Sequence, residues 1–401
     1  MMAVDHFVLS LCLILFVGRL LGDIFNRLKL PSVVGEILAG LILGPTLLNW
    51  VKPHETLGVI AELGVILLLF SIGCETSIKR LYQSGPSAVG VAVLGIVLPA
   101  AVIGLTATFW LKQDGFTALY LGCALTATSI GISVRVLSHA GKAQSAEGHV
   151  ILGAAVIDDI VGVILLSVLF NFVAAGELNL TNALLLMVKV LGFLIVSPPL
   201  TRVLIYAFRF LRPTENKGGY EAVITLILIC FFAWLAHALG APALLGGFAV
   251  GLALSRQFVS PLNRYLQNPF SFTHEMESAS KPLVDVFAPI FFVYVGISLD
   301  LSQIDFTLDG ILVLVGLSIL AILTKLAAGL AVKGSWRQKM IVGSAMVPRG
   351  EVGLVFAEMG LQFNIISSKL FTELVLVIAV TTLLGPILLK VFLRERKGTS
   401  A

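Results

Sequence analysis

The chain has 401 residues, of which 58% are hydrophobic and only 12% are charged, and its formal net charge is +4. A soluble protein needs roughly 25% charged residues to cover its surface. The composition therefore excludes a soluble enzyme and predicts an all-α protein that crosses a membrane many times.

Apolar stretches of about 20 residues, separated by polar or Gly/Pro clusters, predict thirteen transmembrane helices. Their approximate ranges are 6–24, 32–48, 57–77, 86–110, 117–137, 148–173, 181–208, 220–238, 242–255, 282–299, 307–332, 338–361 and 369–393. The first stretch lacks a basic leader region, so we interpret it as a retained helix. No appended soluble domain is expected.

Basic residues recur in every second loop, from Arg27 and Lys29 near the start to Arg394 and Arg396 in the tail. The intervening loops contain few Lys and Arg residues. By the positive-inside rule, the N-terminus is expected outside and the C-terminus in the cytoplasm.

Thirteen helices divide into six, a connector and six. Because the shift between the halves is odd, corresponding helices run in opposite directions. The sequence thus predicts two inverted six-helix repeats, the architecture of many secondary transporters. In this scheme the span 117–137 corresponds to the span 338–361.

Both of these corresponding spans contain an interruption. Thr126–Gly131 is polar and ends in glycine, and the segment Val347–Gly353 contains Pro348, Arg349 and Glu351. Proline removes a backbone hydrogen bond, and irregular backbone at membrane depth is tolerated where it is buried in protein or lines water. Taken singly, each has an ordinary alternative, because Thr and Ser often bond to their own helix and Pro kinks are common. Together they predict crossed discontinuous helices.

Asp158 and Asp159 lie within the span 148–173. One central Asp costs roughly 3 kcal/mol in a transmembrane helix, which favours a functional interpretation. Adjacent side chains diverge by about 100° on a helix, so the two carboxylates have different tasks. We expect Asp159 to bind a small cation and protons in alternation, and Asp158 to pair with Lys325, although that lysine can also extend to the interface. Burial favours the protonated carboxyl, so proton and cation compete for one site.

These motifs resemble the cation:proton antiporter superfamily. The closer match is its second family, which holds bacterial two-aspartate sodium/proton antiporters and glutathione-gated potassium efflux systems. Two further stretches fit this resemblance: Leu30–Glu36 leading to Gly44-Pro45, and Phe287–Phe292 leading to Gly296.

The resemblance implies a homodimer with a dimerisation domain at about 1–84 and 181–305. It implies a core domain at about 85–175 and 306–393 that moves like an elevator. By the same resemblance, Asp159 is the cation- and proton-binding carboxylate and Asp158 is the partner of the buried lysine. Thr128 and Ser129 contribute oxygen ligands, and Arg349 and Glu351 match a charged motif.

We expect electrogenic exchange of Na⁺ or Li⁺ for H⁺ in a bacterial inner membrane. The potassium efflux branch usually has Gln where this chain has Asp158, and carries a cytosolic nucleotide-binding domain, but K⁺/H⁺ exchange stays open. An ion channel that uses the same residues as a filter is the alternative from another class. An intramembrane aspartyl protease is disfavoured because its carboxylates must face each other. Neither catalysis, nor a resident cofactor, nor nucleic acid is expected; the partners are lipids, monovalent cations and protons.

Overall fold

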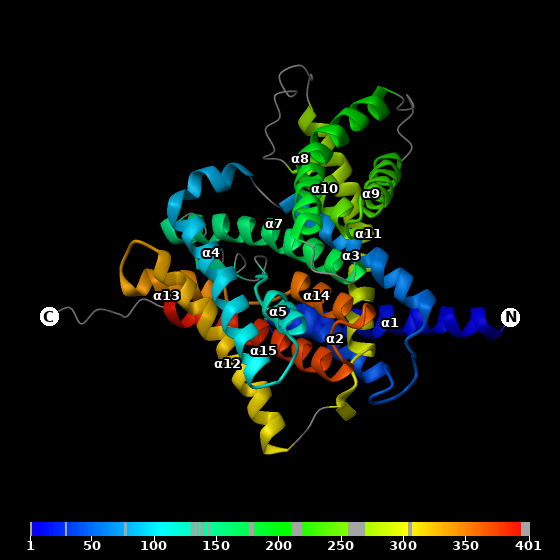
Figure 1. The fold of residues 1–401 in the computed structure, drawn as a ribbon. Coiled ribbons are helices and arrows are strands. Elements are labelled where there is room, and N and C mark those ends of the chain that lie inside the picture. Colours follow the sequence, from blue (N-terminus) through cyan, green and yellow to red (C-terminus); the bar gives the residue numbers. More distant parts are fainter. Residues whose placement is uncertain are drawn as a thin grey trace. The chain divides into compact units, whose positions relative to one another are not determined.

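The structure is a computed structural model that describes residues 2–28, 30–75, 78–129, 133, 136–137, 140–142, 145–175, 180–210, 219–255, 269–303 and 307–393. Within these residues all regular secondary structure is helical. In chain order the elements are α1 (Met2–Arg27), α2 (Ser32–Leu43), α3 (Glu55–Glu75), α4 (Ile78–Phe109), α5 (Gly115–Ala124), α7 (Ala146–Ala175), α8 (Leu180–Phe210), α9 (Tyr220–Ala238), α10 (Leu244–Leu254), α11 (Pro269–Ile297), η2 (Leu301–Gln303), α12 (Leu308–Ala328), η3 (Gly329–Ala331), α13 (Trp336–Ala345), α14 (Glu351–Gln362) and α15 (Ser368–Leu393) (Figure 1).

In the described residues, nine helices are long and apolar enough to cross a membrane. Shorter apolar helices lie at Ser32–Leu43, Gly115–Ala124, Leu244–Leu254 and Val352–Gln362. Each predicted span coincides with a helix or with a helix that ends in a break. The all-helical polytopic fold is therefore confirmed, while the count of thirteen crossings and the inverted repeat stay predictions.

In two of the predicted spans the backbone leaves the helix before the span ends. The span 32–48 is longer than α2, which stops at Leu43, where Gly44 takes extended backbone and donates to the carbonyl of Gly40. Pro45 follows and cannot donate the next helical hydrogen bond. Within the span 117–137, α5 ends at Ala124, at the predicted interruption, and the described residues 133, 136 and 137 beyond it are helical.

Residue contacts divide the chain into two compact units. Unit 1 comprises 1–15, 53–79 and 163–294, and unit 2 comprises 16–52, 80–162 and 295–401. The predicted dimerisation and core domains are defined by motion rather than by contact, so they stay a prediction.

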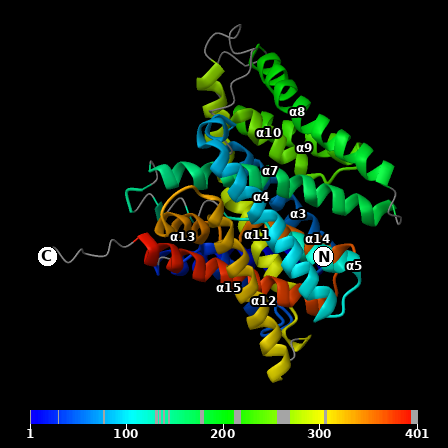
Figure 2. The ribbon, with the colours of Figure 1, turned by 60° about the vertical axis from the view of Figure 1, so that its left-hand side comes forward.

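Glycines bring helices into backbone contact within unit 1. On α10, Gly247 and Gly251 are spaced by four and lie directly against the carbonyl oxygens of Ile66 and Phe70 on α3. Small residues at this spacing let two membrane helices approach closely and gain dispersion energy. Figures 1 and 2 both show α10 beside its partners α8 and α9.

In unit 2, α13 packs against α12 and α15. Gly343 on α13 lies against the carbonyl of Leu326, and Gly329, just after α12, lies against the carbonyl of Lys339. An apolar cluster fills the space beneath them: Ala88, Val91, Ala92, Val136, Leu137, Ile151, Ala154, Ala328, Val332, Ile341, Val342, Ala345, Met346 and Leu389. This packing holds the start of α7 and the whole of α13 at fixed positions within the unit.

Candidate functional site: crossed helix breaks and a buried acid pair

The two interruptions predicted from the sequence lie against each other in unit 2. Residues 127–129 follow the end of α5 without helical structure, and residues 347–350 separate α13 from α14 in the same way. The backbone N–H of Ser129 donates to the carbonyl of Pro348 at 2.9 Å. The hydroxyl of Thr128 donates to the carbonyl of Met346 at 3.3 Å. Hydrogen bonds between the two breaks therefore satisfy some of the backbone groups that have no partner within their own helix.

The sequence of the second break explains how the two segments approach so closely. Pro348 has no N–H, so its position cannot continue the helix. A Cβ on Gly350 would lie 2.6 Å from the Cβ of Ser129, which is closer than side chains approach. The hydroxyl of Thr382 on α15 donates to the carbonyl of Arg349. Glycine at the crossing and threonine on the neighbouring helix thus fix the extended backbone in place.

The acid pair lies in the same unit, in the middle of α7. Asp158 is 2% exposed and Asp159 is 7% exposed. Lys325 on α12 is fully buried, and its Nζ lies 3.0 Å from Asp158 Oδ2. Gly95 on α4 leaves room for the lysine, since a Cβ there would lie 3.4 Å from Nζ. The structure therefore brings Asp158 and Lys325 together as a dry ion pair.

Asp159 follows Asp158 in the same helix, so its side chain diverges by about 100° from the direction of the ion pair. Its buried carboxylate is not the group that Lys325 contacts at 3.0 Å. A buried carboxylate needs a counter-charge, a ligand cation or a proton. The structure thus places Asp158 in an ion pair with Lys325 and keeps Asp159 buried beside it.

Arg349 is a second fully buried cation beside this pair. Its Nη2 donates to the carbonyl of Ala321 at 3.0 Å, one turn before Lys325 on α12. Among the described residues its Nε and Nη1 have no hydrogen-bond partner. Its charge acts on both Asp158 and Lys325. Lys325, Arg349, Asp158 and Asp159 therefore place two buried cations and two buried carboxyl groups in this part of unit 2. Their formal charges sum to zero only when both carboxyl groups are ionised.

The remaining predicted residues have varied surroundings. The hydroxyl of Thr126 donates to the carbonyl of Cys123, which is the ordinary bond of a threonine to its own helix. Glu351 is the first residue of α14, but its side chain lies outside the described part of the chain, and so does Gly131.

Two acids of unit 2, Glu358 on α14 and Glu373 on α15, are buried but were not predicted as site residues. Glu358 on α14 is 7% exposed, and the side-chain amide of Gln362 approaches its Oε1 at 3.4 Å. The signal was present, because Glu358 is a lone acidic residue within the apolar run 352–361.

Buried acids beside crossed, discontinuous helices are typical of secondary transporters for small cations. Over residues 12–395 the chain matches the family described as sodium/hydrogen exchanger, transmembrane. The chain therefore belongs to the sodium/hydrogen exchanger family.

Known relatives extend over nearly the whole chain. The high-affinity Na⁺/H⁺ antiporter NhaS3 of Synechocystis sp. is 32% identical over 94% of this chain and 88% of its own length. The Na⁺/H⁺-K⁺ antiporter GerN of Bacillus cereus is 34% identical over 96% of each chain. Among solved structures, the sodium proton antiporter MjNhaP1 of Methanocaldococcus jannaschii at pH 8 is 17% identical with a TM-score of 0.74, covering 97% of this chain and 100% of that one. This last likeness shows a shared fold.

Proposed function

We propose that the protein is a secondary active antiporter that exchanges Na⁺ or Li⁺ for H⁺ across a membrane. The observation that carries this proposal is the buried Asp158–Lys325 pair, 3.0 Å apart, next to Asp159 in the same unit as the crossed breaks. A membrane protein retains buried charges at such a cost where they serve an ion pathway. The relatives named as Na⁺/H⁺ antiporters support the same assignment.

In the proposed cycle Asp159 exchanges its occupant while Lys325 holds Asp158. The protonated carboxyl of Asp159 releases H⁺ to one side, and the carboxylate then binds Na⁺. Thr128, Ser129 and the carbonyl groups of the breaks supply oxygen ligands, which suit a hard alkali cation. The site crosses when Asp159 carries a cation or a proton, because bare charge at membrane depth is disfavoured. The exchange consumes one bound proton for each cation that takes its place on this carboxylate.

We further propose that a core domain, about 85–175 and 306–393, carries the site across by an elevator motion against a dimerisation domain, about 1–84 and 181–305, of a homodimer. The N-terminus lies outside and the C-terminus in the cytoplasm of a bacterial inner membrane. More protons than cations cross in each cycle, because the Asp158–Lys325 pair carries a proton in addition to the one that Asp159 exchanges, and the cycle is therefore electrogenic. Catalytic chemistry and a resident cofactor have no part in it; Na⁺, Li⁺ and H⁺ are cargo.

Potassium is a second candidate substrate. The relative GerN is named a Na⁺/H⁺-K⁺ antiporter, and it is 34% identical over nearly the full length of both chains. The buried oxygen ligands proposed here do not by themselves separate Na⁺ from K⁺, because both ions are hard and singly charged. Cation selectivity is therefore part of the test.

The test uses purified protein in liposomes that carry a pH-sensitive dye and an imposed pH gradient. Na⁺, Li⁺, K⁺ and Rb⁺ are added in turn to wild type and to Asp159→Asn. We expect saturable collapse of the gradient by Na⁺ and Li⁺ in wild type and none in the variant. A response to K⁺ would extend the substrate range, whereas flux that neither saturates nor requires the pH gradient would indicate a channel. A wild-type protein that responds to no cation contradicts the proposal.

Electrogenicity has its own readout in the same liposomes. We expect an imposed membrane voltage to change the initial exchange rate, and we expect transport to generate a voltage when no other ion can move. An exchange rate that is independent of voltage would show that equal charges cross in both directions.

A further inference from the structure

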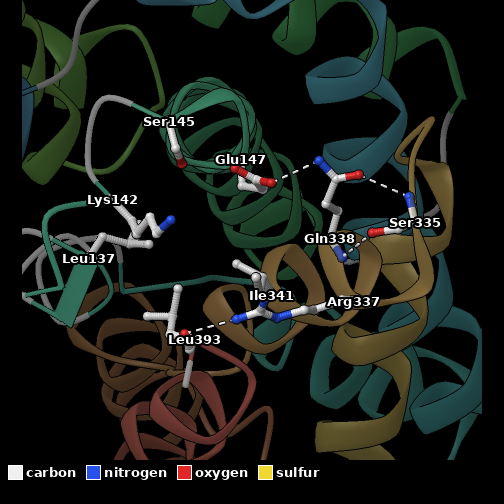
Figure 3. Close-up of a pocket in the computed structure, with 9 residues that line it drawn as sticks. All are labelled: Leu137, Lys142, Ser145, Glu147, Ser335, Arg337, Gln338, Ile341 and Leu393. Carbon is white, nitrogen blue, oxygen red and sulfur yellow. Dashed lines mark hydrogen bonds between the residues drawn. The ribbon is translucent and has the colours of Figure 1, made fainter. Parts of the chain in front are cut away.

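A surface cavity of about 380 Å³ lies in unit 2 at the starts of α7 and α13 (Figure 3). Its lining residues are Leu137, Lys142, Ser145, Glu147, Ser335, Arg337, Gln338, Ile341 and Leu393. They come from the segment before α7 and its first turn, from Ser335 and the first two turns of α13, and from the end of α15. The volume falls in the range of small-molecule pockets, about 300–1,000 Å³. All three segments belong to the basic loops that the positive-inside rule assigns to the cytoplasm.

Two cationic side chains face this cavity from different segments. Lys142 and Arg337 lie on opposite sides of it in Figure 3. Arg337 is held in place by two bonds to the end of α15, from Nε to the carbonyl of Phe392 at 3.2 Å and from Nη2 to the carbonyl of Leu393 at 3.1 Å. Neither bond uses Nη1, so an anchored guanidinium keeps a donor for a ligand.

The one acidic side chain in the lining has a partner on α13. Glu147 Oε1 accepts a hydrogen bond from Gln338 Nε2 at 2.8 Å. The hydrogen bond draws this carboxylate toward α13, as Figure 3 shows, while Lys142 lies on the other side. With two cations and one carboxylate, the lining has an excess of positive charge.

The start of α13 adds neutral donors to these cations. Ser335 caps the helix, its Oγ accepting from the backbone N–H of Gln338 at 3.3 Å, and its own N–H donates to Gln338 Oε1 at 2.9 Å. The hydroxyl hydrogen of Ser335 is not used in this capping box. A helix start also carries partial positive charge, which favours anions.

We infer that this cavity binds a phosphate monoester from the cytoplasmic side, with Lys142 and Arg337 as its charged ligands and the Ser335 hydroxyl as a donor. A phosphate group can accept from several donors arranged around it, whereas a cation is repelled by the excess positive charge. The group can belong to a free anion such as a nucleotide or to a lipid headgroup, and these sources share the chemistry that the cavity recognises.

Occupancy of the cavity would connect the two helices that lead to the transport site. From Glu147, α7 runs for about three turns to Asp158, and α13 runs from Trp336 to the break at 346–350. A phosphate held between Lys142 and Arg337 would tie these helix starts together and change the rate of exchange. This regulatory consequence rests on the proposed antiport function, but binding itself does not.

The experiment measures binding to the purified full chain by calorimetry. The probes are inorganic phosphate and AMP in detergent solution, and phosphatidylcholine nanodiscs with or without phosphatidic acid. Wild type is compared with Lys142→Gln and Arg337→Gln. Lys333→Gln is the matched control, because this exposed lysine lies in the same basic turn as Ser335 but does not line the cavity. Arg337 also anchors α15, so Lys142→Gln, in the segment before α7, keeps the test decisive if Arg337→Gln unfolds.

We expect at least one of these probes to bind wild type, and we expect binding at least tenfold weaker in Lys142→Gln but unchanged in Lys333→Gln. Preference for phosphatidic acid would identify the lipid source, and preference for AMP or phosphate the soluble one. If no probe binds wild type, or if Lys142→Gln binds as tightly, the inference is overturned. Binding that leaves the exchange rate of active protein unchanged would overturn the regulatory consequence alone.

Discussion

The two units of this protein bury their charged groups in different settings. In unit 1, α10 meets α3 through Gly247 and Gly251 against backbone carbonyl oxygens, and the contact carries no charge. Where unit 1 buries charged side chains, Arg202 Nε donates to the carbonyl of Ala253 at 2.8 Å, and Glu221 is 8% exposed. Unit 2 instead buries an ion pair, a second arginine and further carboxyls beside two broken helices.

This difference separates what stabilises the fold from what makes it functional. Close backbone packing supplies dispersion energy at no electrostatic cost. Buried ion pairs seldom stabilise a protein more than apolar residues of the same shape would, because both charges lose their hydration. The charges of unit 2 therefore need a reason other than stability, and the proposed transport cycle would supply one.

The largest effect is expected when one member of the buried pair is removed. Lys325→Ala leaves Asp158 without its cation, and we expect a loss of about 3–5 kcal/mol in the free energy of unfolding in detergent. Replacing both partners, with Lys325→Met and Asp158→Leu together, should recover most of that stability while transport stays lost. A Lys325→Ala protein as stable as wild type would contradict the pairing of Lys325 with Asp158.

The next effect concerns the glycine contact of unit 1. In Gly251→Ala the added Cβ meets the carbonyl oxygen of Phe70, and two packed helices must separate. Overpacking of this kind costs about 1–3 kcal/mol, and we expect the upper part of that range, measured by unfolding. The matched control is Gly192→Ala on α8, where a Cβ meets nothing within 4 Å. Equal stability of the two variants would show that α3 and α10 are not in backbone contact.

The crossing in unit 2 should respond differently to the same substitution. Gly350→Ala places a Cβ 2.6 Å from that of Ser129, but residues 347–350 are not helical and can shift more easily. We expect a stability loss of about 1 kcal/mol, at the lower end of the overpacking range, and at least tenfold slower exchange in liposomes. Gly115→Ala, where a Cβ meets nothing within 4 Å, serves as the control. If Gly350→Ala exchanged ions at the wild-type rate, the crossing would not position the cation site.

The smallest effect is expected at the exposed start of α5. Asp114 caps this helix, accepting from the backbone N–H of Phe116 at 3.0 Å and of Thr117 at 3.1 Å. A hydrogen bond from the Thr117 side chain, followed by the bonds from backbone N–H groups, lowers the pKa of Asp114. The cap therefore contributes fully above the ordinary carboxyl pKa and is lost as the pH falls through the lowered value.

We expect Asp114→Ala to lose at most about 1 kcal/mol at neutral pH, and this loss should shrink on acidification. Asp114→Asn keeps a capping oxygen that does not titrate, so its stability should differ little from wild type at neutral pH. A deficit of Asp114→Ala that grows as the pH falls would contradict this account of the cap.

Much of this architecture could be read from the sequence because hydrophobic length and charge patterning act locally. The apolar runs located the helices, and Pro348 with its flanking glycines marked the break before α14. Asp158 and Asp159 indicated the candidate site, because two adjacent acids are unusual within an apolar helix. Gly44 and Pro45 also encode the early end of α2 at Leu43, but the length of the apolar run alone does not predict it.

What the sequence could not give were contacts between distant segments. The bond from Ser129 to Pro348 and the cavity between Lys142 and Arg337 each join residues about 200 positions apart. Burial of Glu358 likewise depends on which side of α14 faces its neighbours, and a short, almost wholly apolar helix does not specify that side. Tertiary packing decides such features, and it is encoded only in the sum of many weak preferences.

In the proposed cycle one cation and one proton compete for the carboxyl of Asp159. The direct measurement adds Na⁺ to purified protein in a weakly buffered detergent solution and records the protons released. Wild type should release protons in a saturable manner, as should Glu358→Gln, which removes a buried carboxyl that the proposed cycle does not use. Asp159→Asn should release none. Undiminished proton release from a folded Asp159→Asn protein would contradict the account and place the exchange on another residue.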